Sequence, residues 1–382
     1  MRSVSLRRAS CASAAALIGI VLASISPIAF AQTDERPEET AEDAKEITGA
    51  KTSSKPGFLF APIPLSEPVL GPGLAVTGIV VYKLANSGPH ASHTGIFAGA
   101  TANGTWAGGI THSMKLRNDG IRINGLLAYG HLVQKYFGLS GNLDPPIDYE
   151  QDTFLLKVAP RFRIDDSDWF AGFEYRYEST DTTSDSAIPP AQQGRAAPDA
   201  GHLRVGGLSA IGAYDDRDNL YSATRGRLLE AQLGVFAPWL GGTGRFAKGR
   251  FEYRRFVSRH GRLVLGGRVK SEFIDGDEAP FFELPYLELR GYARGQIRDE
   301  ITLSAEMEAR YDIFWRLTGA VFGGVGWAAE NYGTIFSGTT RVAGGFGVRY
   351  NLRPQDRLKL GIDIAWAVNG QPALYLRVGE AF

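Results

Sequence analysis

Sulphur is scarce in this chain, which has one cysteine and three methionines among its 382 residues. The cysteine, Cys11, lies in a leader that we expect to be removed. Disulfide frameworks and thiolate-based metal or redox sites are therefore excluded from the remaining protein. An excess of charge is absent too, because 41 basic residues balance 41 acidic ones. This neutrality argues against nucleic acid as a partner.

Long apolar runs are missing beyond residue 31. Charged residues, proline or glycine interrupt each run before it reaches the roughly 18 residues that a membrane-spanning helix requires, so inner-membrane helical proteins are excluded. The chain instead contains 47 glycines, 15 tyrosines and 21 phenylalanines, with short apolar alternations between them. This composition is typical of strands and turns.

The first 31 residues have the pattern of a secretory signal peptide. Basic residues precede an apolar stretch over residues 14–25, and the small residues Ala29 and Ala31 follow it. Residues 32–55 are rich in acidic, hydroxyl and lysine side chains, and we expect a disordered periplasmic segment there. The remaining residues, 56–382, are predicted to form one domain.

Alternating segments of about ten residues recur from Gly57 onward, and about sixteen can be counted. They predict an all-β fold, a transmembrane antiparallel β-barrel. Short turn-prone connections at Asn103-Gly104, Asp119-Gly120 and residues 165–168 are expected at the periplasmic rim. Longer polar connections, above all residues 179–201, are expected to be extracellular loops.

The two faces of the segments differ in chemistry. In residues 301–314 the charged side chains of Glu306, Glu308 and Arg310 share one parity, and apolar side chains take the other. Residues 358–366 repeat the pattern with Lys359 and Asp363 on the polar parity. A membrane barrel would turn the charges to a wet lumen and the apolar face to lipid. A secreted soluble β-protein, with the apolar face in its core, remains the alternative.

Four segments carry a family signal: residues 214–226, residues 289–292, residues 306–310 and residues 373–382. Together they resemble the BamA/TamA superfamily, the bacterial surface antigen barrels. The resemblance implies a barrel in the bacterial outer membrane, surrounded by its lipid, with one extracellular loop inserted into the lumen.

The first segment contains Asp216, Arg217, Asp218 and Asn219, with Gly226 closing it. It looks like the arginine-aspartate-asparagine turn of that superfamily, which lies at the periplasmic side. Asp and Asn side chains accept backbone hydrogen bonds in turns, which explains these residues equally well without a special role.

The second segment, Arg290-Gly291-Tyr292, is similar to the arginine-glycine-aromatic signature on the lumenal loop. The resemblance implies that Arg290 is a buried cation paired with lumen carboxylates of the third segment, Glu306 and above all Glu308, and that Gly291 permits a sharp tip. An ordinary Arg-Gly turn on a solvated loop is the alternative. One departure concerns the next strand: where relatives tend to carry Phe-x-Asp, this chain has glycine at position 324. Either this chain lacks the lock, or Glu306, Glu308 or Asp363 takes the place of the missing aspartate as the partner of Arg290.

The fourth segment, including Leu376, Val378, Gly379 and Phe382, looks like the terminal strand of the superfamily. We expect a lipid-facing apolar edge that ends in Phe382. The resemblance implies that the barrel assembly machinery captures it by strand addition during biogenesis. Simple closure of the barrel against the first strand is the alternative, and both can hold.

Full-length members of the superfamily insert outer-membrane proteins or export polypeptides, and they carry POTRA modules. Because residues 32–55 are too few for such a module, we expect this chain to resemble the short branch of the superfamily without POTRA domains. Insertion or translocation of outer-membrane protein or lipid through a lateral seam is the first functional hypothesis, with outer-membrane proteins as clients. Pro62, Pro64 and Pro68 in or near the first strand would leave that seam incompletely paired. The alternative is a passive channel plugged by the loop that carries Arg290.

Catalysis is not expected, and neither is a cofactor or a metal site. Enzymatic barrels need a nucleophile beside a base, and the adjacent His112 and Ser113 point to opposite faces of a strand. No cluster of histidine and acidic residues has metal-ligand spacing.

Overall fold

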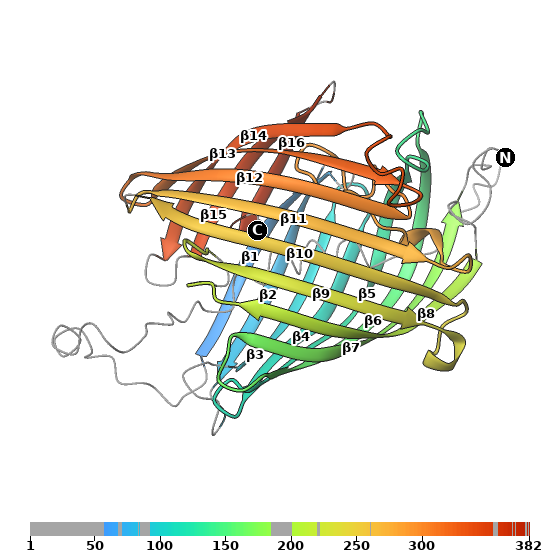
Figure 1. The fold of residues 1–382 in the computed structure, drawn as a ribbon, viewed down its shortest axis with the longest axis horizontal. Helices are drawn as coiled ribbons and strands as arrows, with labels where there is room; N and C mark the ends of the chain where they lie inside the picture. Colours follow the sequence, from blue (N-terminus) through green and yellow to red (C-terminus); the bar gives the residue numbers. More distant parts are fainter. Residues whose placement is uncertain are drawn as a thin grey trace, which may run out of the picture.

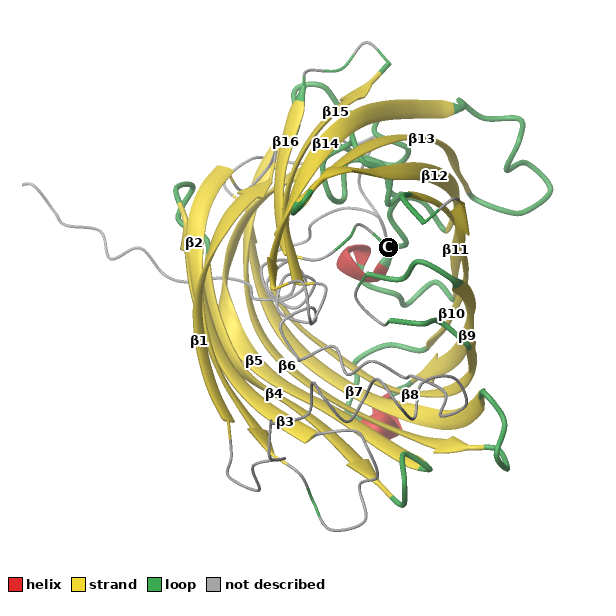
Figure 2. Cartoon of the chain, turned by 90° about the vertical axis from the view of Figure 1, so that its left-hand side faces the viewer, coloured by secondary structure: helices red, strands yellow, loops and turns green. Residues whose placement is uncertain are grey.

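A computed structural model describes residues 57–67, 71–82, 84, 92–184, 201–219, 222–259, 261–353, 358–368, 370, 372–378, 380 and 382. The predicted leader, the segment 32–55, Pro68 and Gly379 lie outside these residues. Sixteen strands form one antiparallel sheet in which each strand pairs with the next along the chain, and the sheet curls into a barrel (Figures 1 and 2). The predicted all-β barrel is confirmed.

The strands are β1 (Gly57–Glu67), β2 (Gly71–Tyr82), β3 (Ser92–Thr101), β4 (Trp106–Leu116), β5 (Ile121–Tyr136), β6 (Ile147–Arg163), β7 (Trp169–Ser184), β8 (Gly201–Asp215), β9 (Gly226–Phe236), β10 (Phe246–Arg259), β11 (Leu263–Asp275), β12 (Ile301–Phe314), β13 (Leu317–Ala329), β14 (Arg341–Arg353), β15 (Leu358–Ala367) and β16 (Ala373–Val378). In the part of the chain that the structure describes, two single-turn 3-10 helices, η3 (Pro238–Leu240) and η4 (Phe281–Glu283), lie in connections. None of the helices in the described residues is long and apolar enough to cross a membrane.

The strand faces alternate as the sequence predicted. On β12 the side chain of Met307 is 71% exposed on the outer face, whereas Glu306 and Glu308 on the other parity are buried inside the barrel. Leu233 on β9 and Val321 on β13 are also exposed outward. An apolar outer face around a charged interior is the arrangement of a lipid-embedded barrel, not of a soluble sheet with an apolar core.

The ends of the barrel require one correction. Connections in an antiparallel barrel alternate between its two ends. Asn103-Gly104, between β3 and β4, therefore lies at the same end as the long connection between β11 and β12, which carries Arg290 and which the family resemblance places on the extracellular side. The prediction that Asn103-Gly104 marks the periplasmic rim is therefore wrong, although a tight turn does form there with Gly104 at φ 97°. Turn length follows the local hairpin geometry and does not report the end of the barrel. Asp119-Gly120 and residues 165–168 lie at the opposite end.

The first and last strands of the sheet lie beside each other. β1 pairs with β2 over all of its 11 residues, and β16, with 6 residues, pairs with β15 from Leu360 to Ala365. β1 and β16 are in contact, but within the described residues no strand register joins them. We call this boundary the seam.

Candidate functional site

The connection between β11 and β12, residues 276–300, folds back into the lumen, and green loop segments lie inside the ring of strands in the view along the barrel (Figure 2). Its residues Leu287, Leu289 and Ile297 form a buried apolar cluster with Ala343 of β14. Leu287 N–H donates to the carbonyl of Ile297 over 2.8 Å, so the two limbs of the loop support each other. Burial of these side chains from water stabilises the inserted position.

Arg290, near the tip of this loop, is surrounded by carboxylates of the barrel wall. Its Nε donates to Glu306 over 2.9 Å, and its Nη1 lies 2.5 Å from Glu308 and 3.3 Å from Asp363. Its guanidinium also lies 3.5 Å from the centre of the Phe322 ring. Burial alone would lower the pKa of Arg290, but the three carboxylates outweigh it and raise that pKa above its ordinary value, so the side chain stays charged.

The glycine at position 324 now has a structural explanation. Gly324 pairs with Glu306 across β12 and β13, and a Cβ atom on Gly324 would lie 2.6 Å from the Cγ atom of Glu306 and 2.7 Å from Leu289. The aliphatic part of the Glu306 side chain thus occupies the space beside Gly324. The sequence left open whether Glu306, Glu308 or Asp363 would pair with Arg290, and all three do.

Gly291 and Tyr292 connect the loop tip to the last strand. Gly291 has a φ of +113°, and a Cβ atom there would lie 2.9 Å from Ala343, so glycine is required both for the conformation and for the close approach. Its N–H donates to the hydroxyl of Tyr375 on β16 over 3.0 Å, and that hydroxyl donates to the carbonyl of Tyr292 over 3.3 Å. The loop therefore contacts one side of the seam directly.

A second layer of charges lies beneath Arg290. Arg349 of β14, which is fully buried, pairs with Asp363 and lies 3.6 Å from Glu308. Arg310 of β12 also lies 3.6 Å from Glu308. Glu308 and Asp363 are therefore each shared between Arg290 of the loop and cations of the strands, which offsets the cost of burying them.

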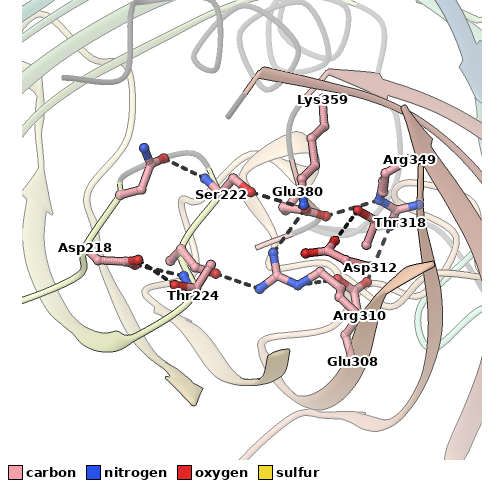
Figure 3. Close-up of polar contacts among 12 residues, drawn as sticks. Asp218, Ser222, Thr224, Glu308, Arg310, Asp312, Thr318, Arg349, Lys359 and Glu380 are labelled. Carbon is pink, nitrogen blue, oxygen red and sulfur yellow. Dashed lines mark hydrogen bonds and ion pairs between the residues drawn. The ribbon is translucent and has the colours of Figure 1, made fainter. Parts of the chain in front are cut away.

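Glu380 completes this layer from the end of the chain (Figure 3). Its carboxylate accepts from Arg349 over 3.1 Å and from Lys359 over 2.9 Å, and Arg310 lies 3.3 Å away. Burial would raise the pKa of Glu380, but Arg310, Lys359 and Arg349 outweigh it and hold that pKa well below its ordinary range. Glu380, two residues beyond the end of β16, is thus held inside the lumen by charge.

Phe382 corrects the expectation of a lipid-facing terminal aromatic. Its ring is buried in a cluster with Ala223 and Phe256, 5.7 Å from the guanidinium of Arg290, and the chain ends inside the ring of strands (Figure 2). Parity along a strand predicts the facing of a side chain only while the strand continues, and β16 ends at Val378. Leu374, within the strand, is 46% exposed on the outer face.

The turn between β8 and β9 lies against this terminal segment. Asp218 accepts from the N–H and hydroxyl of Thr224 over 2.8 and 2.6 Å, and Asn219 accepts from Ser222 N–H over 2.8 Å. Ser222 Oγ donates to Glu380 over 3.3 Å (Figure 3). The turn therefore stabilises itself by the backbone hydrogen bonds that its residue types predict, and it also supports the tail.

The remaining residues of this turn motif act locally. Asp216 accepts from the N–H of Arg227, and Arg217 pairs with Asp215 over 2.7 Å. Gly226 has a φ of +94°, and a Cβ atom there would lie 2.3 Å from the carbonyl of Asp216. These contacts close the turn.

Comparison with known proteins agrees with this architecture. The model of the Omp85 superfamily domain matches residues 109–375. BamA from Haemophilus ducreyi lacking POTRA domains 1-3 is similar in structure, with a TM-score of 0.58 and 12% identity over 85% of this chain and 69% of that chain. CdiB from Escherichia coli gives a TM-score of 0.59 and 10% identity over 86% of this chain and 63% of that chain.

CdiB from Acinetobacter baumannii gives a TM-score of 0.52 and 8% identity, over 85% of this chain and 59% of that chain. The chain thus spans less than two thirds of either CdiB structure. Identities this low show a shared fold and nothing finer. No curated protein matches the sequence.

Proposed function

We propose that this chain, which belongs to the Omp85 superfamily, inserts or translocates outer-membrane protein or lipid through the seam between β1 and β16. Membership of this superfamily implies a location in the bacterial outer membrane. The observation that carries the proposal is the seam itself, where two contacting strands share no ladder within the described residues. Unpaired strand edges bind an additional strand readily, so the seam offers a client a place to pair.

Two prolines of β1 favour an open edge. Pro62 and Pro64 are two residues apart, so the positions of their missing N–H groups fall on the same side of the strand. Proline within a sheet is confined to positions where the N–H would point away from the ladder, and β1 is in register with β2 over its whole length. The missing donors therefore belong to the edge that faces β16.

The insertion proposal is tested with purified protein in liposomes and an unfolded barrel protein as client. Client folding, followed by the heat-modifiable shift on gels, should be faster than in protein-free liposomes. A disulfide between introduced cysteines on β1 and β16 should abolish the gain, and reduction should restore it. A control disulfide across the register pair Leu127 and Leu156, in the continuous ladder of β5 and β6, should leave it intact. Equal folding with the seam oxidised and reduced would refute the proposal.

A plugged channel is the second candidate, and the inserted loop favours it. A cavity of about 130 Å³ between the loop and the barrel wall is lined by the polar side chains of Arg268, Glu288, Arg290 and Glu306, so the loop does not fill the lumen completely at this point. Deletion of the loop should raise ion conductance in planar bilayers. Unchanged conductance would leave the loop without a plugging role.

A further inference from the structure

We propose that a second set of ion pairs, centred on Glu283, holds the inserted loop independently of Arg290. In this set the loop supplies the negative charge, whereas at Arg290 the loop supplies the positive charge. This inference rests on the plugged channel as a property of the proposed barrel and names the residues that would hold the plug. Glu283, with Arg176 and Lys248, is called the Glu283 lock. Arg290, with Glu306, Glu308 and Asp363, is called the Arg290 lock.

The Glu283 lock joins the start of the loop to two strands. Glu283 lies in η4, is 1% exposed, and accepts hydrogen bonds from both terminal nitrogens of Arg176 on β7, one of them over 2.9 Å. Lys248 Nζ of β10 lies 3.2 Å from the same carboxylate and donates to the carbonyl of Glu283 over 2.8 Å. A two-nitrogen contact with one carboxylate fixes orientation as well as distance.

Apolar packing on both sides keeps water from these ion pairs. Phe281 is buried against the rings of Tyr149 and Tyr136, at centroid distances of 5.3 and 6.3 Å. Leu284 belongs to a buried cluster on the other side, which also contains Val205, Phe236, Phe246, Ile274 and Ala279. Arg176 also pairs with Glu178 of its own strand, so it keeps one partner when Glu283 is removed. Loss of the loop from the lumen would nevertheless break the buried ion pairs of Glu283 with Arg176 and Lys248, so the lock resists that loss.

The two locks use different parts of the barrel. Glu283 binds side chains of β7 and β10, whereas Arg290 binds side chains of β12 and β15. In one lock the loop supplies the anion and in the other it supplies the cation. No side chain that pairs with Glu283 also pairs with Arg290 among the described residues. Neutralising Arg290 alone therefore leaves the loop bound to β7 and β10 through Glu283.

The test is a set of charge-removing variants measured for conductance in planar bilayers, each first shown to be folded by its heat-modifiable shift. Glu283→Gln and Arg290→Gln should each stay near wild-type conductance, and the double variant should exceed either by at least about tenfold. Glu278→Gln, an exposed carboxylate on the same loop, is the matched control and should change nothing in either background. The pair of substitutions Arg176→Gln and Arg290→Gln should raise conductance as the first double variant does, because it removes the partner of Glu283 on the barrel wall.

A charge swap separates the ion pair from a merely structural effect. In the Arg290→Gln background, Glu283→Arg should open the channel and the further change Arg176→Glu should close it again. Ala293→Cys, in a chain with Cys11 replaced by serine, should react with a polymer-linked maleimide only in the open variants, because Ala293 is 9% exposed.

The inference is overturned if Arg290→Gln alone opens as fully as the double variant, if the double variant opens no more than either single one, or if the swap does not restore closure. None of these readouts involves a client. Failure of the second lock is therefore distinguishable from failure of the insertion proposal, which client folding decides.

Discussion

The N–H of Gly291 and the hydroxyl of Tyr375 form a hydrogen bond of 3.0 Å between the tip of the inserted loop and the last strand. The same hydroxyl donates to Tyr292, so one side chain of β16 satisfies two backbone groups of the loop. Asp363, on the neighbouring strand β15, pairs with Arg290 of that loop. Displacement of the loop would thus disturb the strand that borders the seam.

Substituting Tyr375 with Phe should weaken this connection. The change removes both hydrogen bonds and leaves the N–H of Gly291 without its partner, at a cost of about 1–3 kcal/mol in the free energy of unfolding. Urea unfolding in liposomes measures it. Tyr350→Phe, at a residue 40% exposed on β14, serves as the control and should unfold like wild type. A Tyr375→Phe protein as stable as that control would show that the connection contributes nothing.

Restoring the aspartate of the relatives should harm this protein. Gly324→Asp would force a side chain into the space of Glu306 and Leu289 and bring two carboxylates together, which we expect to cost about 1–3 kcal/mol of stability. Adding Glu306→Ala should recover part of the loss, because the new carboxylate then takes the place of Glu306 beside Arg290. Unfolding midpoints of the single and double variants decide this, and a single variant as stable as wild type would contradict the observed packing.

Neutralising Glu380 should destabilise the barrel strongly. Glu380→Gln leaves Arg310, Arg349 and Lys359 without their shared counterion, and loss of one member of such a buried group typically costs about 3–5 kcal/mol. The exposed loop residue Glu330 provides the control, Glu330→Gln, which should stay within about 0.5 kcal/mol of wild type. Similar unfolding curves for the two variants would mean that the tail does not depend on this charge.

Acid should release the Glu283 lock only at low pH. Burial would raise the pKa of Glu283, but Arg176 and Lys248 outweigh it and lower that pKa from 4.5 to about 2. A carboxylate with a lowered pKa in the folded state contributes its stability above its ordinary pKa and loses it as pH falls toward the folded value. In Arg290→Gln protein, which keeps the Glu283 lock, conductance should be constant from pH 7 to 5 and rise between about pH 4.5 and about 2. Opening already at pH 6 would contradict this assignment.

Sequence alternation was sufficient to predict the barrel, because lipid outside and charge inside impose a period of two on every strand. The pairing of Arg290 with Glu306 and Glu308 also followed from the family resemblance. Arg349, Tyr375 and Glu380 were missed as site residues, since each joins the site through contacts between strands or through the tail, and no local pattern marks such contacts. The predicted lipid-facing position of Phe382 was wrong because β16 ends at Val378, so strand parity no longer applies to Glu380, which pairs with Arg310 and Arg349, or to Phe382.

The seam, as the place where a client meets the protein, is the central claim, and site-specific photo-crosslinking tests it most directly. A photoreactive residue at Leu374, 46% exposed on β16, is compared with one at Leu233, 59% exposed on β9 away from the seam. The account predicts crosslinks to a folding outer-membrane protein from position 374 and not from position 233. Equal crosslinking at the two positions, or none at position 374 while client folding is accelerated, would contradict it.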